Sequence, residues 1–174
     1  MKWILILLLC LAGLLAIAIL ALLVLGLLQP VKHSVTRSLH LKQKPAAVFG
    51  VLEDPGWSTA VLKVEPLPAR AGKPVSRVTL RWGHMQMIMT QLERTPPTRL
   101  VVSMSKDGGP TLGTWTYQLS TEDDGCRITV TEEGEMANPI YRAVGRIRGL
   151  DANILQTLRD LASKFGESAE IREN

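Results

Sequence analysis

Residues 112–135 read LGTWTYQLSTEDDGCRITVTEEGE, and this stretch indicates the fold more directly than any other part of the chain. Its two arms, Leu112–Leu119 and Arg127–Glu135, alternate bulky apolar residues with polar ones, which is the period of a half-buried strand. Between them, Glu122-Asp123-Asp124-Gly125 is a turn signal. The stretch therefore predicts two antiparallel strands joined by a tight turn.

Further segments with the same period of two precede this hairpin. Turn-forming residues separate them, and Gly83-His84 marks one short hairpin. A first strand is expected over Val31–Leu41, followed by a short helix over Lys44–Leu52 that opens with a proline. The other predicted strands are Val61–Leu67, Val75–Trp82, Met85–Arg94 and Arg99–Met104. Together with the hairpin they predict an antiparallel meander of about seven strands.

The chain is expected to close with one long amphipathic helix. Asn138 can cap its start, and Gly166 is a plausible stop after Phe165. Its apolar residues recur every three or four positions: Ile140, Val144, Ile147, Leu150, Ile154, Leu158, Leu161 and Phe165. A stripe of this length must lie against apolar surface, and the inner face of the meander is the candidate. Residues 167–174 are expected to form a frayed polar tail.

This order of elements is that of the helix-grip fold, an α+β architecture in which a curved antiparallel sheet wraps a long C-terminal helix. The local sequence resembles the SRPBCC (START-like, polyketide cyclase/dehydrase-like) superfamily over roughly residues 33–166. The stretches that carry the resemblance are SVTRSLHL and PAAVFGVLEDPGW within 34–57, GTWTYQL at 113–119 with RITVTEEGE at 127–135, and NPIY at 138–141. The resemblance implies an apolar cavity between sheet and helix. Members include lipid carriers, hormone receptors, cyclases and co-chaperones, so it implies a fold more than an activity.

Residues Trp3–Leu28 form an unbroken apolar run, WILILLLCLAGLLAIAILALLVLGLL, without a charge or a proline. About 20 apolar residues suffice to cross a bilayer, so the run predicts a transmembrane helix. A secretory signal has a shorter apolar stretch, of about 7–15 residues, and a small-residue cleavage site that the exit LLQPVK lacks. The predicted organisation is an anchor over 1–29, a helix-grip domain over 30–166 and the polar tail; a cleaved signal is the alternative.

The basic residues beside the apolar run predict its orientation. Lys2 precedes the run, whereas Lys32, Arg37, Lys42 and Lys44 follow it. Counted by the positive-inside rule, they favour a cytoplasmic position for the domain. A long apolar segment at the N-terminus can also deliver the following domain across the membrane, which is the alternative.

Composition narrows the partners. The net charge of +4 over 174 residues comes without a basic block, so a nucleic-acid partner is not expected. Cys10 in the apolar run and Cys126 in the domain are not expected to pair, and no His pair has metal-ligand spacing. Gly108-Gly109 reads as a turn rather than a phosphate-binding loop. We therefore expect no metal and no cofactor, with the bilayer and a hydrophobic small molecule as partners.

Alternation also predicts which residues line the cavity. Met85, Met87 and Met89 share one strand face, and polarizable methionines suit a wall that adapts to varied apolar ligands. Trp115 and Tyr117 share a face, and Trp82 is expected to turn inward with Leu80. The residues predicted to bind the ligand are Trp57, Trp82, Met85, Met87, Met89, Trp115, Tyr117 and Glu132. The alternative for each apolar member is simple core packing.

Glu132 is the most informative polar residue, because the alternation that turns Ile128 and Val130 inward does the same to Glu132. A bulge near Gly134 would reverse this direction. An inward carboxylate needs a partner, and Arg81, His84 or Tyr117 could supply one. It could hold the polar end of a ligand or act as a general acid or base; the alternative is a rim glutamate paired with a surface arginine. The candidate catalytic residues are Glu132, Tyr117 and His84.

The leading hypothesis from sequence is a membrane-anchored binding protein that holds a lipid or other hydrophobic small molecule. One alternative is an enzyme of the polyketide cyclase or dehydratase type. Another is a protein-interaction module of the co-chaperone kind.

Overall fold

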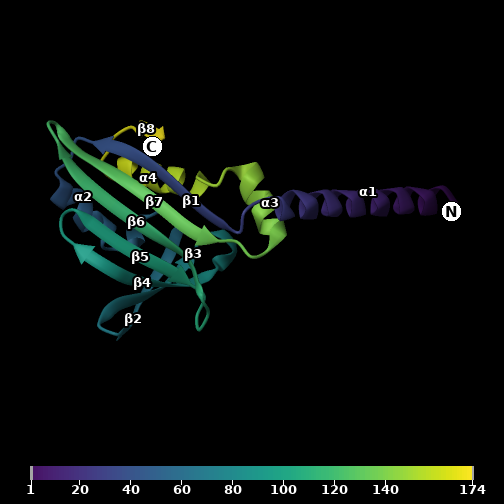
Figure 1. Cartoon of the computed structure of the whole chain (residues 1–174), viewed down its shortest axis with the longest axis horizontal. Coiled ribbons are helices and arrows are strands. Elements are labelled where there is room, and N and C mark those ends of the chain that lie inside the picture. Colours follow the sequence, from purple (N-terminus) through teal and green to yellow (C-terminus); the bar gives the residue numbers. More distant parts are fainter. Residues whose placement is uncertain (1, 174) are drawn as a thin grey trace. The chain divides into compact units, whose positions relative to one another are not determined.

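Figure 1 shows the computed structural model of the chain, which describes residues 2–173. The helices are α1 (Lys2–Leu27), α2 (Pro45–Leu52), α3 (Pro139–Arg148) and α4 (Ala152–Lys164), with short 3-10 turns η1 (Pro55–Trp57) and η2 (Trp82–His84). The strands are β1 (Lys32–Leu41), β2 (Val61–Arg70), β3 (Lys73–Leu80), β4 (Gln86–Thr95), β5 (Arg99–Ser105), β6 (Thr111–Glu122), β7 (Gly125–Glu135) and β8 (Ile171–Glu173).

The chain divides into two compact units. The first, called here the stem unit, comprises residues 1–33 and 135–150 and contains α1 and α3. The second, called here the sheet unit, comprises residues 34–134 and 151–174 and contains most of the sheet, with α2 and α4. The boundary between the units therefore separates α3 from α4, although the two helices follow each other in the chain.

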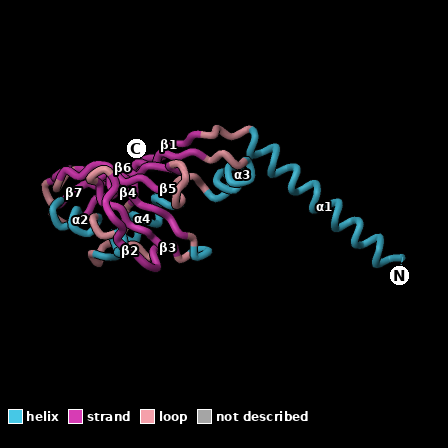
Figure 2. Tube along the Cα trace, turned by 90° about the horizontal axis from the view of Figure 1, so that it is seen from below, coloured by secondary structure: helices cyan, strands magenta, loops and turns pink. Residues whose placement is uncertain are grey.

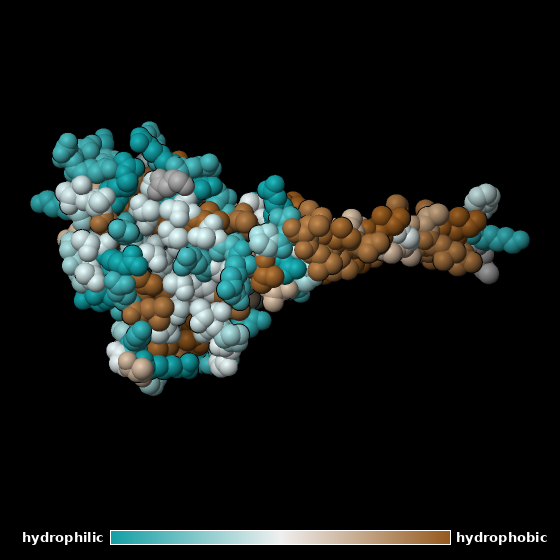
Figure 3. Space-filling view, viewed as in Figure 1, coloured by the Kyte–Doolittle hydropathy of each residue, from teal (hydrophilic) through white to brown (hydrophobic). Residues whose placement is uncertain are grey.

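α1 is a helix of apolar residues without an acidic side chain in its first turn or a basic one in its last. Among the described residues, α1 is the one helix that is long and apolar enough to cross a membrane. It lies near the N-terminus, where a membrane anchor and a signal sequence both pass this test. Figure 3 shows the mostly apolar surface of α1. In a lipid environment the helix would satisfy its own backbone hydrogen bonds.

The strands form one sheet in the order β2-β3-β4-β5-β6-β7-β1-β8. From β2 to β7 each strand pairs antiparallel with the next, which confirms the predicted meander. The eighth strand comes from the segment that was expected to be a frayed tail, since Ile171 pairs with Leu39 of β1. Burial of Ile171 against the core and an ion pair between Arg37 and Glu173 at 3.0 Å hold this short strand in place.

The core of the sheet unit lies between one face of the sheet and the helices α2 and α4. Hydrophobic side chains from α4 and from the central strands pack there with less than a tenth of their surface exposed. The largest of them are Leu39, Leu41, Leu100, Ile128, Val130, Ile154, Leu158 and Leu161. We call the face of the sheet that carries the strand residues of this core the inner face. Figure 2 shows α2 and α4 beside the strands of this unit.

The predicted single C-terminal helix is wrong in one respect, because the chain breaks it into α3 and α4. Gly149 ends α3 with a φ of 90°, a backbone conformation that favours glycine. Asp151 then starts α4 and accepts hydrogen bonds from Arg37 Nε and Nη2 at 3.1 and 2.7 Å. The apolar spacing runs on through Leu150, so the periodicity alone gave no sign of this break.

Candidate functional site

The β6–β7 hairpin places Trp115, Tyr117 and Glu132 on the inner face. Trp115 lies directly opposite Glu132, and Tyr117 lies opposite the buried Val130. The rings of Trp115 and Tyr117 are 6.2 Å apart between centroids and tilted by 35°. All three side chains are only partly buried, whereas Ile128 and Leu119 further along the same face are sealed. The inward direction predicted for Glu132 is therefore confirmed, and the three residues form one cluster.

The surroundings of this cluster change its ionisation. Burial raises the pKa of Glu132 to about 7, because a partly dehydrated carboxylate loses the water that stabilises its charge. Burial also raises the pKa of Tyr117, and the nearby charge of Glu132 raises it further. Near neutral pH, Glu132 thus exists both as a neutral acid that donates a hydrogen bond and as an anion, while Tyr117 stays neutral.

Two glycines lie beside the cluster, and their pairing across β6 and β7 was not predicted from the sequence. Gly113 pairs with Gly134 in the β6–β7 register, one inner-face position beyond the pair of Trp115 and Glu132. A Cβ at Gly113 would meet the carbonyl oxygen of Glu133 at 3.0 Å, so a larger residue there would push the two strands slightly apart. As a result, this pair places no side chain on the inner face next to Trp115 and Glu132. The alternation of the strands could have identified this pair, because Gly113 lies two residues before Trp115 and Gly134 lies two residues after Glu132.

The methionines of the β3–β4 region divide between the core and the surface. Met87 is buried opposite Val78, and Met89 packs against the core opposite Met104 of β5. Met85 precedes β4 and is exposed, although its carbonyl oxygen accepts a hydrogen bond from the Leu80 amide at 2.8 Å. Two of the three predicted wall methionines therefore face the inside of the sheet unit.

Trp57 occupies the η1 turn and packs against the core. Asp54 begins this turn by accepting a hydrogen bond from the Gly56 amide at 2.8 Å. The residues after Trp57 are tied to α4, since Asp160 accepts from the Thr59 amide at 2.8 Å and from its hydroxyl at 2.6 Å. Burial acts to raise the pKa of Asp160, but these hydrogen bonds outweigh it, so the pKa is lowered. The Asp160 carboxylate thus holds the segment that follows Trp57 against α4.

The inward strand position predicted for Trp82 is wrong. β3 ends at Leu80, and Trp82 lies in the η2 turn with 76% of its surface exposed. Arg81 has helical φ and ψ values of −60° and −40°, so the chain leaves the strand conformation before Trp82 can alternate inward. Gly83 and His84 continue the turn with φ values of 64° and 50°. His84 is exposed in the same turn.

The structure does not bring this turn to the Glu132 cluster along the sheet. β5 and β6 separate β4, which follows this turn, from β7, which carries Glu132. Measured across the sheet, the backbones of β4 and β7 are therefore three strand spacings apart, about 14 Å at the usual 4.8 Å per spacing. Arg81, one of the partners predicted for Glu132, instead donates from Nε to the Thr59 carbonyl oxygen at 3.1 Å. Of the three predicted partners, Tyr117 is the one on a strand adjacent to Glu132.

The described residues of the sheet unit contain one thiol, that of Cys126, and it is buried. Within residues 2–173, no group of three or more His, Cys, Asp or Glu side chains is arranged to hold a metal ion. Cys126 is a free, fully buried thiol, and burial raises its pKa to about 11. It is therefore an unreactive core residue.

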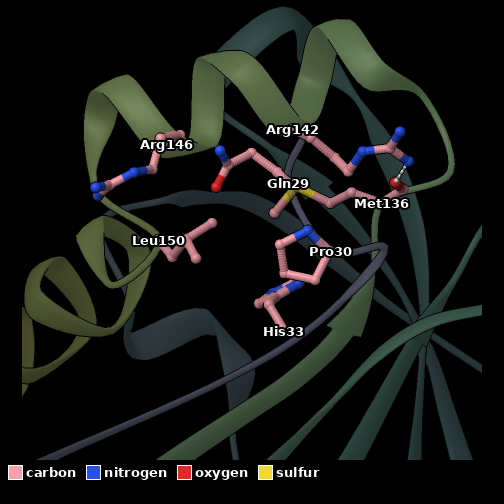
Figure 4. A pocket seen from close by; sticks show the side chains of 7 residues that line it. All are labelled: Gln29, Pro30, His33, Met136, Arg142, Arg146 and Leu150. Carbon is pink, nitrogen blue, oxygen red and sulfur yellow. Dashed lines mark hydrogen bonds between the residues drawn. The ribbon is translucent and has the colours of Figure 1, made fainter. Parts of the chain in front are cut away.

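The stem unit contains a separate small hollow of about 60 Å³, seen in Figure 4. The residues around it are Gln29, Pro30, His33, Met136, Arg142, Arg146 and Leu150. Burial lowers the pKa of His33, which favours the neutral imidazole there. A cavity of about 10–15 Å³ by the same measure holds one water, so the hollow has room for a few waters rather than a lipid chain.

The family of the chain follows from its sequence match over this same region. Residues 32–166 match the family described as polyketide cyclase / dehydrase and lipid transport. The chain therefore belongs to this SRPBCC family, as the resemblance predicted. No curated protein was found to match the chain.

Solved structures share the fold at low sequence identity. The di-domain ARO/CYC BexL from the BE-7585A biosynthetic pathway is 14% identical, with a TM-score of 0.60 over 80% of this chain and 52% of its own. The Zhui aromatase/cyclase from Streptomyces sp. R1128 is 13% identical, with a TM-score of 0.59 over 76% and 93%. TTHA0849 from Thermus thermophilus is 16% identical, with a TM-score of 0.60 over 76% and 96%. This chain spans about half the length of the di-domain protein, and these likenesses concern the fold alone.

Proposed function

We propose that this protein is a membrane-anchored binding protein that holds a lipid or other hydrophobic small molecule on the inner face of its sheet. The observation that carries the proposal is the partly buried cluster of Trp115, Tyr117 and Glu132 beside the bare Gly113–Gly134 pair. Aromatic rings supply apolar contact area, and the paired glycines leave inner-face positions without side chains. Met87 and Met89 extend the same face.

The chemistry of Glu132 indicates what the ligand carries at one end. With a pKa of about 7, its carboxyl group can donate a hydrogen bond to a carbonyl or hydroxyl oxygen while it is protonated. An apolar ligand would dehydrate this carboxyl further and so favour its neutral form. We therefore expect a mainly hydrocarbon ligand with a weakly polar, uncharged end group, bound more tightly below pH 7 than above it.

An uncleaved anchor is favoured over a cleaved signal by contacts inside the stem unit. Arg142 Nε donates to the carbonyl oxygen of Gly26 at 2.7 Å, and a Cβ on Gly26 would lie 1.7 Å from the carbonyl oxygen of Pro139. These contacts join the C-terminal end of α1 to α3, which lies more than a hundred residues later. Cleavage after the apolar run would remove them and leave the Arg142 guanidinium without one of its acceptors.

We place the sheet unit on the cytoplasmic side because Lys32, Arg37, Lys42 and Lys44 follow the span and Lys2 alone precedes it. Residues 28–31 are the whole connection between α1 and β1, at most about 3.5 Å each. Such a short tether keeps the first strand near the bilayer from which an apolar ligand would come. A reporter fused after the C-terminus and read for cytoplasmic or periplasmic activity tests the orientation.

Native mass spectrometry of the full chain, released from detergent micelles, tests the binding function. The expected result is a copurified hydrophobic small molecule that survives washing and is lost from Trp115→Ala. Thr116→Ala is the matched control, because Thr116 lies on the same strand but faces the other side of the sheet. Trp115→Phe keeps an aromatic ring on the inner face, so it should fold and retain ligand. It thereby distinguishes a loss of binding from a loss of folding. If the wild-type chain carries no ligand and takes up none from lipid extract, the proposal fails.

A cyclase or dehydratase activity is the second candidate, favoured by one observation: Glu132 titrates near neutrality on the strand beside Tyr117. A general acid or base works best with a pKa near the operating pH. In this case Glu132 would exchange a proton with the substrate, and Tyr117 would donate a hydrogen bond to its oxygen. Turnover of a poly-β-ketone probe should then fall at least about 100-fold in Glu132→Gln while binding persists. Unchanged turnover in that variant would exclude this role.

A further inference from the structure

α3 has an apolar face that nothing in its own unit covers. Ile140, Val144 and Ile147 follow the i, i+4, i+7 spacing and are 38%, 42% and 67% exposed. Tyr141, at the edge of this face, is 67% exposed. On a helix of 3.6 residues per turn, Arg142 projects to the opposite side. A short helix with so sharp a division between its faces is typical of a site of interaction.

The other side of α3 is fastened to the end of α1. Arg142 is only 7% exposed, and its guanidinium donates to three carbonyl oxygens, those of Gly26 at 2.7 Å and of Met136 and Ala137 at 3.0 Å. The last carbonyls of a helix have no partner within it, so this contact caps α1. Figure 4 shows Arg142 reaching back to Met136, and Figure 1 shows α3 across the end of α1.

The position of α3 at the end of α1 indicates what covers its apolar face. If α1 spans a bilayer, its last turn marks the boundary between hydrocarbon and headgroups. Gly26 lies in that turn, and its backbone packs directly against the backbone of Pro139, the first residue of α3.

The flanking residues fit the same environment. Tyrosine is enriched at membrane interfaces, where its ring lies among acyl chains and its hydroxyl among headgroups. Tyr141 and Arg148 border the apolar face on one side, and both are exposed. A basic residue at this depth gains from anionic headgroups. No acidic residue occurs between Asn138 and Gly149 to oppose this.

We propose that α3 is an in-plane interfacial helix. Ile140, Val144 and Ile147 insert at the boundary between headgroups and acyl chains, with Tyr141 and Arg148 at headgroup level. α3 is thereby a second membrane contact, fixed to the span by the cap that Arg142 makes. This inference rests on the proposed anchor, because a cleaved α1 would leave α3 with no defined depth.

Depth-dependent quenching of single-cysteine probes tests the inference on the full chain in vesicles of phosphatidylcholine and phosphatidylglycerol. Cys10→Ala removes the thiol in α1, and Cys126 stays unlabelled because it is fully buried. An environment-sensitive fluorophore is then placed at Val144→Cys. Leu62→Cys on β2, an apolar residue that is 47% exposed, is the matched control. Leu14→Cys reports on α1 itself.

The expected result is that a nitroxide carried on the lipid quenches the Val144 probe at least about threefold more than the Leu62 probe. Iodide in the buffer should quench the two probes in the reverse order. A second probe at Ile147 should agree with Val144, which excludes a local effect of one label. Replacing phosphatidylglycerol by phosphatidylcholine should weaken the effect without abolishing it.

Each other outcome overturns the inference in a recognisable way. If iodide reaches Val144 as easily as Leu62 while the lipid nitroxide still quenches Leu14, the anchor stands and the interfacial helix is wrong. If neither quencher reaches Val144, protein covers the face and the lipid assignment is wrong. If the lipid nitroxide fails at Leu14, the proposed anchor itself fails.

Discussion

α3 and α4 carry one continuous apolar stripe in the sequence but have opposite surroundings in the structure. In α4, Leu158 and Ile154 are 0% exposed and complete the core of the sheet unit, whereas in α3 Ile147 is 67% exposed. The helices differ in what lies opposite the stripe rather than in the stripe itself. Hydrophobic periodicity therefore predicts a helix and its apolar face, but it does not predict what that face meets.

The largest expected effect comes from replacing one apolar side chain in each helix by alanine. Leu158→Ala should lower the free energy of unfolding of the sheet unit by about 3 kcal/mol, because it leaves a cavity in a sealed core. Ile147→Ala should change it by less than about 0.5 kcal/mol in detergent. Urea unfolding of the full chain in micelles, followed by circular dichroism, measures both. Equal losses would mean that α3 also packs in a protein core.

The break between α3 and α4 can be tested by whether Gly149→Ala lowers or raises the free energy of unfolding. Gly149 has a φ of 90° and ψ of 128°, which an alanine adopts only with strain. Gly149→Ala should therefore cost about 2 kcal/mol in the same unfolding experiment. If α3 and α4 form one continuous helix in solution, alanine would instead stabilise the chain by about 1 kcal/mol.

Glu132 tests whether the inner face outside the sealed core is also dehydrated. Its pKa is about 7 in the folded chain and lower when unfolded, so ionisation opposes folding, and stability falls as pH rises toward 7. Glu132→Gln should stabilise the chain by about 1–2 kcal/mol at pH 8 and by much less near pH 5, after allowing for partial exposure. Thermal unfolding at the two pH values measures this. If the stability difference between Glu132→Gln and the wild-type chain is the same at both pH values, the pKa of Glu132 is not raised in the folded chain.

The smallest expected effect concerns the ion pair at the start of α4. Arg37 Nη2 lies 2.7 Å from Asp151 Oδ2, and both side chains are mostly shielded from water. Asp151→Asn should cost about 1 kcal/mol, with part of the loss masked in high salt. Asp123→Asn, in the exposed β6–β7 turn, is the control for removing a surface charge. If both variants are equally stable, the pair does not hold the start of α4.

Much of the fold and part of the site could be predicted from the sequence because the strand period is simple. Trp115, Tyr117 and Glu132 fall on one face by alternation alone, and the register confirms it. Trp82 was misplaced because the same alternation was extended past Leu80, whereas the strand ends there and Arg81 takes helical backbone angles. The break at Gly149 and the strand at Ile171–Glu173 depend on tertiary partners, chiefly Arg37, which no local pattern reveals.

The most direct test of the binding function is photo-cross-linking of the full chain in nanodiscs with a lipid that carries a diazirine in its acyl chain. We predict adducts on the inner face, in peptides that contain 113–119 and 130–134, that disappear when an excess of unlabelled ligand extract is added. Adducts on α1 and α3 should persist, because bulk lipid surrounds them. Adducts confined to α1 and α3, with none on the inner face, would contradict the proposal that the sheet holds a hydrophobic ligand.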